Sequence, residues 1–223
     1  MPEISLTDFV NFVTRSGSPK LTKVRQIRNR EEYDPIRDFW KELREGLVRY
    51  HAGSGEDKQD LDALVDATLE ARQDHYREAI KGYKRFLGRK SVQWFEPPRI
   101  TWYEGDLGIR INPELGLIIN GVPTVIKVHF KSRQLTKRRI ECILLLMEDA
   151  LRPHCQEHDR FAVLDCWTGK LFHSDQPRWK IRPYLIGEAR AFSTMWTELA
   201  RMERAALEAK WGRPELTLHA PPA

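Results

Sequence analysis

Apolar residues recur at helical spacing through most of the first half of the chain. A short helix is predicted to begin at Ser5, which can cap its first turn, and to end at Gly17-Ser18-Pro19. A second is predicted to begin at Asp34-Pro35, where a carboxylate precedes a proline at the first helical position, and to end at Gly53-Ser54-Gly55. A long helix over residues 57–87 follows, because its apolar residues keep the same spacing.

The pattern changes to β-strands after Glu96-Pro97-Pro98. Four runs rich in β-branched and aromatic residues, separated by turn residues, predict a meander of strands over residues 99–104, 108–112, 115–119 and 124–130. Asn120-Gly121 between the last two runs indicates a two-residue hairpin. The remaining predicted elements are a helix over residues 136–151, a strand pair over 161–167 and 170–173, and a helix over 188–211.

The order of these elements predicts an α+β fold, in which a helical N-terminal half packs on a mixed or antiparallel sheet and a C-terminal helix closes the structure. We divide the chain into a helical N-terminal region (1–96), a β-rich core with one helix (97–186), a C-terminal helix (187–212) and a tail (213–223). The helix over residues 57–87 lies in the first region by sequence and can also pack as part of the core.

Composition limits the class of protein and its compartment. The chain has 223 residues, of which 41% are hydrophobic, so a buried core is expected. No apolar run approaches the ~20 residues of a membrane-spanning helix, and the first residues lack the basic start and apolar core of a signal peptide. Cys142, Cys155 and Cys166 form no Cys-x-x-Cys pair, which is typical of reduced thiols. We therefore expect a cytoplasmic protein without membrane contact, and its oligomeric state stays open.

Positive charge is concentrated in three segments of the chain. Lysine and arginine number 37 against 32 aspartates and glutamates, which gives a formal net charge of +5. Clustered cations can neutralise several phosphates together, so nucleic acid or another polyanion is the predicted partner. The alternative is that the clusters are solvated helix faces. The cations that we assign to binding from the first two clusters are Lys23, Arg25, Lys84 and Arg85.

The third cluster joins a strand to the start of a helix. The period of a strand places Val125, Lys127, His129 and Lys131 on one face, which is predicted to be cationic, with apolar residues on the other. An anion near the helix start would meet both backbone N–H groups and basic side chains, which suits a phosphate. The alternative is neutralisation by nearby acids. The helix start supplies the remaining predicted binding residues, Lys137, Arg138 and Arg139.

The order helix, meandering strands, helix, strand over residues 57–167 resembles the core of the PD-(D/E)XK nuclease superfamily, the restriction-endonuclease-like fold. In that family a carboxylate precedes a strand that carries Glu-x-Lys, the carboxylates hold Mg²⁺, and the lysine positions or activates water. The resemblance implies Asp106 or Glu114 at the acidic position. It implies that Lys127 and His129, or His129 and Lys131, occupy the Glu-x-Lys positions.

The strand departs from that motif because it carries no acid. Lys127 in place of a metal-binding carboxylate would repel Mg²⁺, so the resemblance implies a binding protein that has no cofactor and does not cleave. One alternative is an active nuclease, in which Glu70, Asp106 and Glu114 hold Mg²⁺ while Lys127 and His129 act at the phosphate. Another is a regulatory protein that binds a protein partner through its N-terminal helices.

Two further groups of polar residues carry weaker signals. His154, Cys155 and His158 lie within five residues and could bind zinc together with Cys166 or Asp165, although a polar loop explains them as well. Asp74, His75 and Glu78 on the long predicted helix could form an acid–base group, although a solvated helix face explains them equally well.

Overall fold

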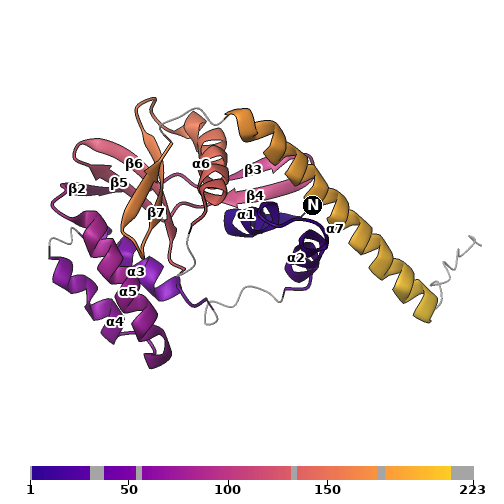
Figure 1. Cartoon of the computed structure of the whole chain (residues 1–223), viewed down its shortest axis with the longest axis horizontal. Coiled ribbons are helices and arrows are strands. Elements are labelled where there is room, and N and C mark those ends of the chain that lie inside the picture. The colour runs from indigo at the N-terminus through magenta and orange to yellow at the C-terminus, as the bar shows by residue number, and fades with distance from the viewer. Residues whose placement is uncertain (1, 31–37, 54–56, 132–134, 175–178, 212–223) are drawn as a thin grey trace, which may run out of the picture.

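The centre of the fold is a five-stranded mixed sheet with the order β2-β5-β6-β7-β8 (Figure 1). Its strands are β2 Val92–Phe95, β5 Leu115–Ile119, β6 Val122–His129, β7 Arg160–Asp165 and β8 Lys170–His173. Helix α6, Lys137–Leu151, makes the crossover between the parallel strands β6 and β7, and the other neighbours are antiparallel. The computed structural model describes residues 2–30, 38–53, 57–131, 135–174 and 179–211. Within these ranges the protein has the predicted α+β fold.

A second sheet of three strands has the order β1-β4-β3. Its strands are β1 Glu3–Ser5, β3 Ile100–Glu104 and β4 Leu107–Ile111, and β1 pairs with β4 in parallel. The predicted meander over residues 99–130 is therefore wrong, because its first hairpin pairs with the N-terminus and not with β5. The side chains of Ile109 and Ile111 pack in a hydrophobic cluster with α1 and α6, which holds this hairpin away from the central sheet. Neither β1 nor β2 was predicted, because such short strands show no clear period.

The N-terminal helices follow local sequence signals. Helix α1, Leu6–Val13, is capped as predicted by Ser5, whose Oγ accepts the backbone N–H of Asp8. Gly17, with a φ of 60°, separates α1 from α2, Ser18–Arg28, which was not predicted. Because Pro19 suits the first turn of a helix, the residues expected to end one helix also begin the next.

Two predicted helices differ from the observed ones. Helix α3 spans Lys41–Ala52, residues 38–40 are not helical, and the predicted start at Asp34-Pro35 lies outside the described residues. The helix predicted over residues 57–87 is divided into the 3-10 helix η1 Lys58–Leu61, α4 Ala63–Asp66 and α5 Glu70–Leu87. The break lies at Leu69, which has an extended ψ of 139°, and at Thr68, whose hydroxyl donates to Glu42 of α3. Tertiary contacts therefore override the helical spacing there.

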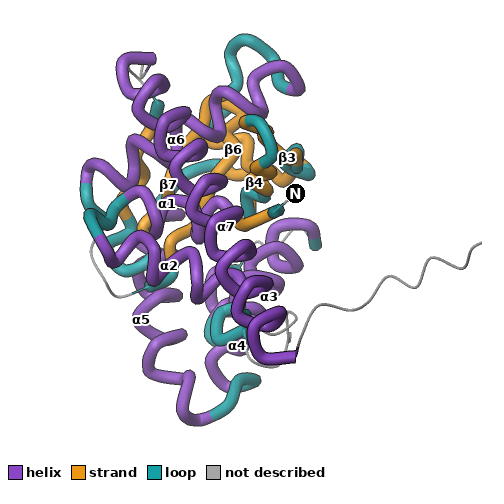
Figure 2. Tube along the Cα trace, turned by 90° about the vertical axis from the view of Figure 1, so that its right-hand side faces the viewer, coloured by secondary structure: helices purple, strands orange, loops and turns teal. Residues whose placement is uncertain are grey.

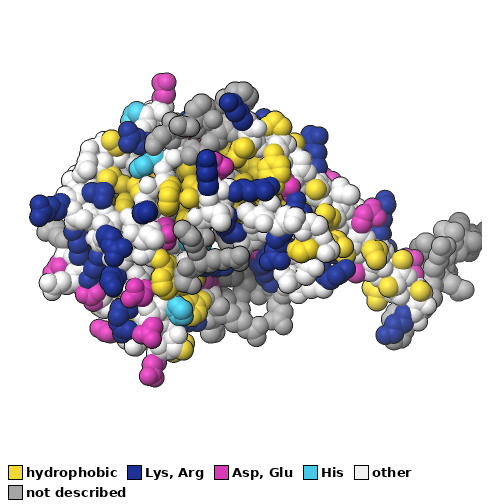
Figure 3. Space-filling view, in the orientation of Figure 1, with side chains coloured by type: hydrophobic (Ala, Val, Ile, Leu, Met, Phe, Trp, Pro, Cys, Tyr) yellow, Lys and Arg dark blue, Asp and Glu magenta, His cyan; other side chains and the backbone are white. Residues whose placement is uncertain are grey.

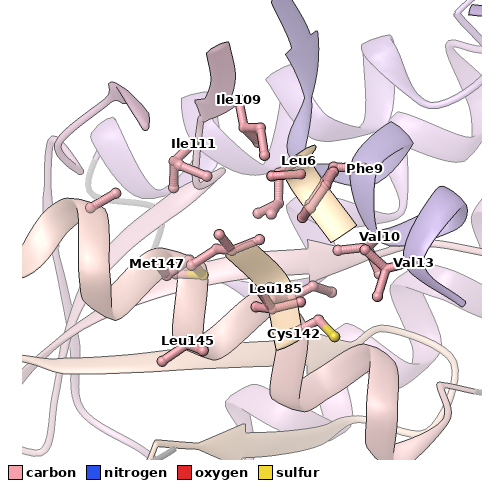
Figure 4. Close-up of a cluster of buried hydrophobic side chains, with 14 of the residues drawn as sticks. Leu6, Phe9, Val10, Val13, Ile109, Ile111, Cys142, Leu145, Met147 and Leu185 are labelled. Carbon is pink, nitrogen blue, oxygen red and sulfur yellow. The ribbon is translucent and has the colours of Figure 1, made fainter. Parts of the chain in front are cut away.

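Helices cover both faces of the central sheet, so the hydrophobic core has two halves. Helices α1, α2, α6 and α7 and strand β4 pack on the face that carries Val125, Phe161 and Val163. Figure 4 shows part of this cluster, where side chains of α1, β4, α6 and α7 converge. Helices α3, α4 and α5 pack on the opposite face, which carries Ile126 and Val128. The predicted apolar face of β6 is therefore observed, while on the other face Val125 is buried and Lys127 and His129 are half-buried.

Helix α7, Arg182–Trp211, begins six residues earlier than the predicted residue 188. Its first half packs on α2, and Figure 2 shows it running along the side of the molecule that faces the viewer. Residues 201–210 are all exposed, including Met202 and Leu207. The 3-10 helices η2 Arg152–His154 and η3 Trp179–Ile181 complete the described elements. None of the described helices is both long and apolar enough to cross a membrane.

Candidate functional site

A cleft of about 1150 Å³ lies where the smaller sheet, the N-terminus of α1 and helix α3 approach the end of the central sheet at which β5 begins and β6 ends. Its lining comes from segments far apart in sequence, which are residues 3–8, Ile27, Arg30, Asp38, Arg44, Glu45, Val48, Arg49, Arg99, Arg110, residues 112–114 and Lys127. The first turn of α1 forms part of the wall, so the helix dipole adds positive potential there. A cleft of this size with converging polar groups is the leading candidate for a binding site in this chain.

Glu114 and Lys127 form an ion pair at the base of the cleft. The Nζ of Lys127 lies 2.6 Å from Oε1 of Glu114, and the two side chains are only 14% and 10% exposed. Lys127 also donates to the carbonyl of Asn112 at 2.8 Å, and the backbone N–H of Val128 donates to the second carboxylate oxygen at 2.7 Å. Both oxygens of Glu114 are therefore occupied, and the pair is fixed in position by the adjacent strands.

Asp8 is the centre of a second ionic group in the wall of the cleft. Lys23 donates to one of its oxygens at 2.9 Å, and the guanidinium of Arg30 contacts both oxygens at 2.9 Å. Burial alone would raise the pKa of this carboxyl, but the hydrogen bonds and charges of Arg30 and Lys23 hold the pKa well below its usual range. Asp8 is consequently ionised at neutral pH, and Lys23 serves this internal pair.

The rim of the cleft carries arginines with half-exposed side chains. Arg30, Arg99 and Arg110 are 53%, 57% and 50% exposed, and Arg49 is also exposed. Arg99 contacts Glu96 at 3.0 Å and Arg110 contacts Glu3 at 3.7 Å, both at the surface. Exposed ion pairs of this kind are worth about 0–1 kcal/mol, so the guanidinium groups of Arg99 and Arg110 can turn toward a bound anion. Arg30, in contrast, is held by both oxygens of Asp8.

A smaller cavity of about 30 Å³ adjoins the base of the cleft. Leu6, Thr7 and Lys127 line both spaces. The cavity is also lined by His129 of β6 and by Arg139, in the first turn of α6. Three of the predicted anion-binding residues, Lys127, His129 and Arg139, are therefore brought together by the fold.

The other residues of the third basic cluster lie outside both spaces. Arg138 donates to the hydroxyl of Tyr184 and its guanidinium lies over the Tyr184 ring. Lys137 is 90% exposed and lies 3.9 Å from Glu141, which is one of the acids considered as an alternative partner. Lys131 is exposed at the end of β6. The cluster is thus divided between the cavity and the surface.

The first two basic clusters are also dispersed. Lys84 contacts Asp62 at 2.7 Å, Arg85 donates to the carbonyl of Thr168, and Arg25 is exposed on α2. None of these three lines the cleft. Figure 3 shows the same dispersion, with Lys and Arg side chains spread among acidic ones over the visible face. The three clusters therefore do not form one continuous basic surface.

The carboxylates considered for a metal site are separated. Glu114 lines the cleft, whereas Glu70 is exposed at the start of α5 and Asp106 is exposed in the turn between β3 and β4. Across the described ranges, no group of three or more His, Cys, Asp or Glu side chains is placed to hold a metal ion. The three carboxylates therefore do not form the predicted set.

The weaker candidates have structural roles or separate positions. Asp165 is buried and accepts hydrogen bonds from the N–H of Trp167 and the hydroxyl of Thr168, so it stabilises the turn after β7. Cys166 is buried in the second half of the core, while His154 and His158 are exposed. His75 packs edge-on against aromatic rings, including that of Trp167, and Asp74 contacts Arg77.

No sequence signal predicted most of the rim. Arg49, Arg99 and Arg110 come from three elements or the segments beside them, and no motif links them. Comparison of the chain with protein-family models, with curated proteins and with solved structures finds no match. The candidate site therefore rests on the geometry of the cleft itself.

Proposed function

We propose that the protein binds nucleic acid or a comparable polyanion in the cleft and does not cleave it. The observation that carries this proposal is the rim of exposed arginines, Arg49, Arg99 and Arg110, around the cleft. The planar guanidinium group donates two parallel hydrogen bonds to phosphate oxygens, which suits it to phosphate recognition.

The charge balance of the cleft supports an anionic ligand. Its described lining has six basic side chains and five carboxylates, and the acidic ones have basic partners. Glu45, for example, lies 3.9 Å from Lys41, which is outside the lining. The other four acids are paired with Arg30, Arg44, Arg110 and Lys127 of the lining itself, so the excess positive charge comes from Arg49 and Arg99. The excess is small, so binding is expected to be moderate and sensitive to salt.

The size of the cleft favours a single strand as the ligand. Its volume of about 1150 Å³ is slightly above the ~300–1,000 Å³ of ordinary small-molecule pockets. A few nucleotides of an extended strand fit such a space, whereas a duplex would have to remain outside it. Half-buried apolar side chains in the wall, such as Ile27 and Val48, offer surface to bases.

The N-terminal helices give less support to a protein-binding function. Leu6, Phe9, Val10 and Val13 of α1 are all buried in the core. The apolar face of helix α1 is therefore buried and cannot bind a protein partner. The polar groups of the cleft, in contrast, remain accessible to a ligand.

The test is a titration of a short fluorescent single-stranded oligonucleotide at several salt concentrations. Each lost phosphate contact reduces the slope of log K against log salt by about 0.7 for single strands. The double variant Arg49→Gln, Arg99→Gln is expected to bind more weakly and to lower the slope by about 1.4. The matched control is Arg77→Gln, Lys81→Gln, which removes two exposed cations of α5 that do not line the cleft. Equal losses in both variants would contradict binding in the cleft.

A further inference from the structure

The small cavity beside Lys127 is closed on its far side by the hydrophobic core. Val10, Ile143 and Val163 form that side, and their exposed fractions are 0%, 8% and 0%. A nucleic-acid strand in an open groove can continue in both directions, whereas a nucleic-acid strand that reaches a closed cavity must end there. The shape of this cavity therefore suits the end of a nucleic-acid strand and not its interior.

The basic groups at this cavity are held in place by the protein. Arg139 donates to Oδ1 of Asn11 at 2.6 Å and to Oγ1 of Thr14 at 3.1 Å, which fixes its guanidinium against α1. Lys127 uses two of its three protons for Glu114 and the carbonyl of Asn112. Groups that are already ordered lose little conformational entropy when a ligand binds, which favours affinity.

The size of the cavity matches a phosphoryl group. One ordered water requires about 10–15 Å³ of such space, so about 30 Å³ accommodates two or three oxygen atoms. A terminal phosphate monoester carries about −1.5 to −2 charges at neutral pH, whereas an internal phosphodiester carries one. A closed cavity lined by Lys127, His129 and Arg139 therefore favours the terminal group.

We propose that this cavity is a subsite for the terminal phosphate of a single strand of nucleic acid. The strand then follows the cleft toward the arginines of the rim. This inference rests on the proposed function of the cleft and adds to it a preference for phosphorylated ends.

The experiment compares three versions of one single-stranded oligonucleotide, with a 5′-phosphate, with a 3′-phosphate, and with hydroxyl groups at both ends. One phosphorylated version is expected to bind the unmodified protein at least about tenfold more tightly than the hydroxyl version, which equals about 1.4 kcal/mol. Equal affinity for all three versions overturns the subsite and leaves the proposed function standing. Failure of all three to bind overturns both.

Variants then locate the preference in the cavity. Arg139→Gln is expected to bring the affinity ratio between the phosphorylated and hydroxyl versions close to one. Lys137→Gln is the matched control, because it removes a charge from the same helical turn outside the cavity and is expected to keep the ratio. If Arg139→Gln keeps the ratio and Lys137→Gln loses it, the subsite is elsewhere and the proposal is wrong.

Two further measurements keep the result interpretable. Since Arg139 also binds α1, His129→Gln serves as a second variant that leaves the contacts to Asn11 and Thr14 intact. The ratio compares two ligands on the same protein, so partial loss of folded protein does not change it. A phosphorylated mononucleotide is tested as well. If it binds as tightly as the phosphorylated strand, the ligand is a small phosphorylated molecule and the strand-end proposal is overturned.

Discussion

The buried contact between His51 of α3 and Tyr83 of α5 predicts a loss of stability on mild acidification. Nε2 of His51 lies 2.5 Å from the Tyr83 hydroxyl, and both side chains are buried. Burial raises the pKa of Tyr83 well above its ordinary value and lowers the pKa of His51 from 6.5 to about 4. The phenol therefore keeps its proton and the imidazole stays neutral. A second proton on the His51 ring would place a positive charge in this buried site.

The magnitude follows from the two protonation states. In the unfolded chain the imidazole binds a proton below its ordinary pKa of about 6.5, while in the folded protein His51 stays neutral down to about pH 4. Between these values the unfolded state holds more protons, so stability falls as the pH falls. At about pH 5 the difference is about 1.5 pH units, or about 2 kcal/mol. The lowered pKa of Asp8 acts differently, because its contribution is lost only at more acidic pH.

The assay is urea unfolding at about pH 8 and about pH 5, which brackets the ordinary imidazole pKa. The free energy of unfolding of the wild type is expected to drop by about 2 kcal/mol more between these conditions than that of His51→Gln. Glutamine retains a side-chain acceptor for Tyr83 but does not titrate. His154→Gln, an exposed position, serves as the control and is expected to behave like the wild type. If His51→Gln shows the same pH dependence as the wild type, the reasoning is refuted.

Two other predictions concern packing and catalysis. A Cβ at Gly82 of α5 would lie 1.6 Å from the carbonyl oxygen of Cys166, so Gly82→Ala is expected to lower the free energy of unfolding by at least about 1–3 kcal/mol. Gly187→Ala in α7, where nothing lies within 4 Å, is expected to cost nothing in the same urea assay, and equal effects would contradict the close approach. With Mg²⁺ or Mn²⁺ added, bound oligonucleotide is expected to stay intact on a denaturing gel, because Lys127 occupies Oε1 of Glu114 at 2.6 Å. Metal-dependent cleavage that disappears in Glu114→Ala would support the nuclease alternative.

Features that depend on neighbouring residues could be predicted from the sequence. The cap at Ser5 needs only a hydroxyl and the first N–H groups of a helix. The hairpin at Asn120-Gly121 needs two residues that accept a positive φ, and the observed values are 49° and 84°. Helix α6 begins and ends within one residue of the predicted range, because its apolar residues keep one spacing throughout. In each case a single short segment contains all the determining groups.

Features that depend on distant segments could not be predicted. The parallel pairing of β1 with β4 joins the N-terminus to residues 107–111, and three residues carry too little pattern to indicate it. The ion pair joins Glu114, just before β5, to Lys127 of the neighbouring strand β6, and it partly neutralises a residue that we expected to bind anions. The arginine rim combines an edge of α3 with residues in or beside the smaller sheet. Its existence depends on how two sheets and a helix meet, which charge clustering along the chain does not reveal.

The cleft contains both fixed and adaptable charged side chains. The ionic groups are fixed, whereas the arginines of the rim can change their partners. Glu114 and Lys127 are nearly buried and are anchored to the strands of the central sheet, so they hold their positions when a ligand arrives. Arg99 and Arg110 are half exposed, and their present partners stabilise them little. A flexible polyanion would therefore gain most of its affinity, and its salt dependence, at the rim. Its position along the cleft would be set at the base, where Lys127 connects the cleft to the closed cavity.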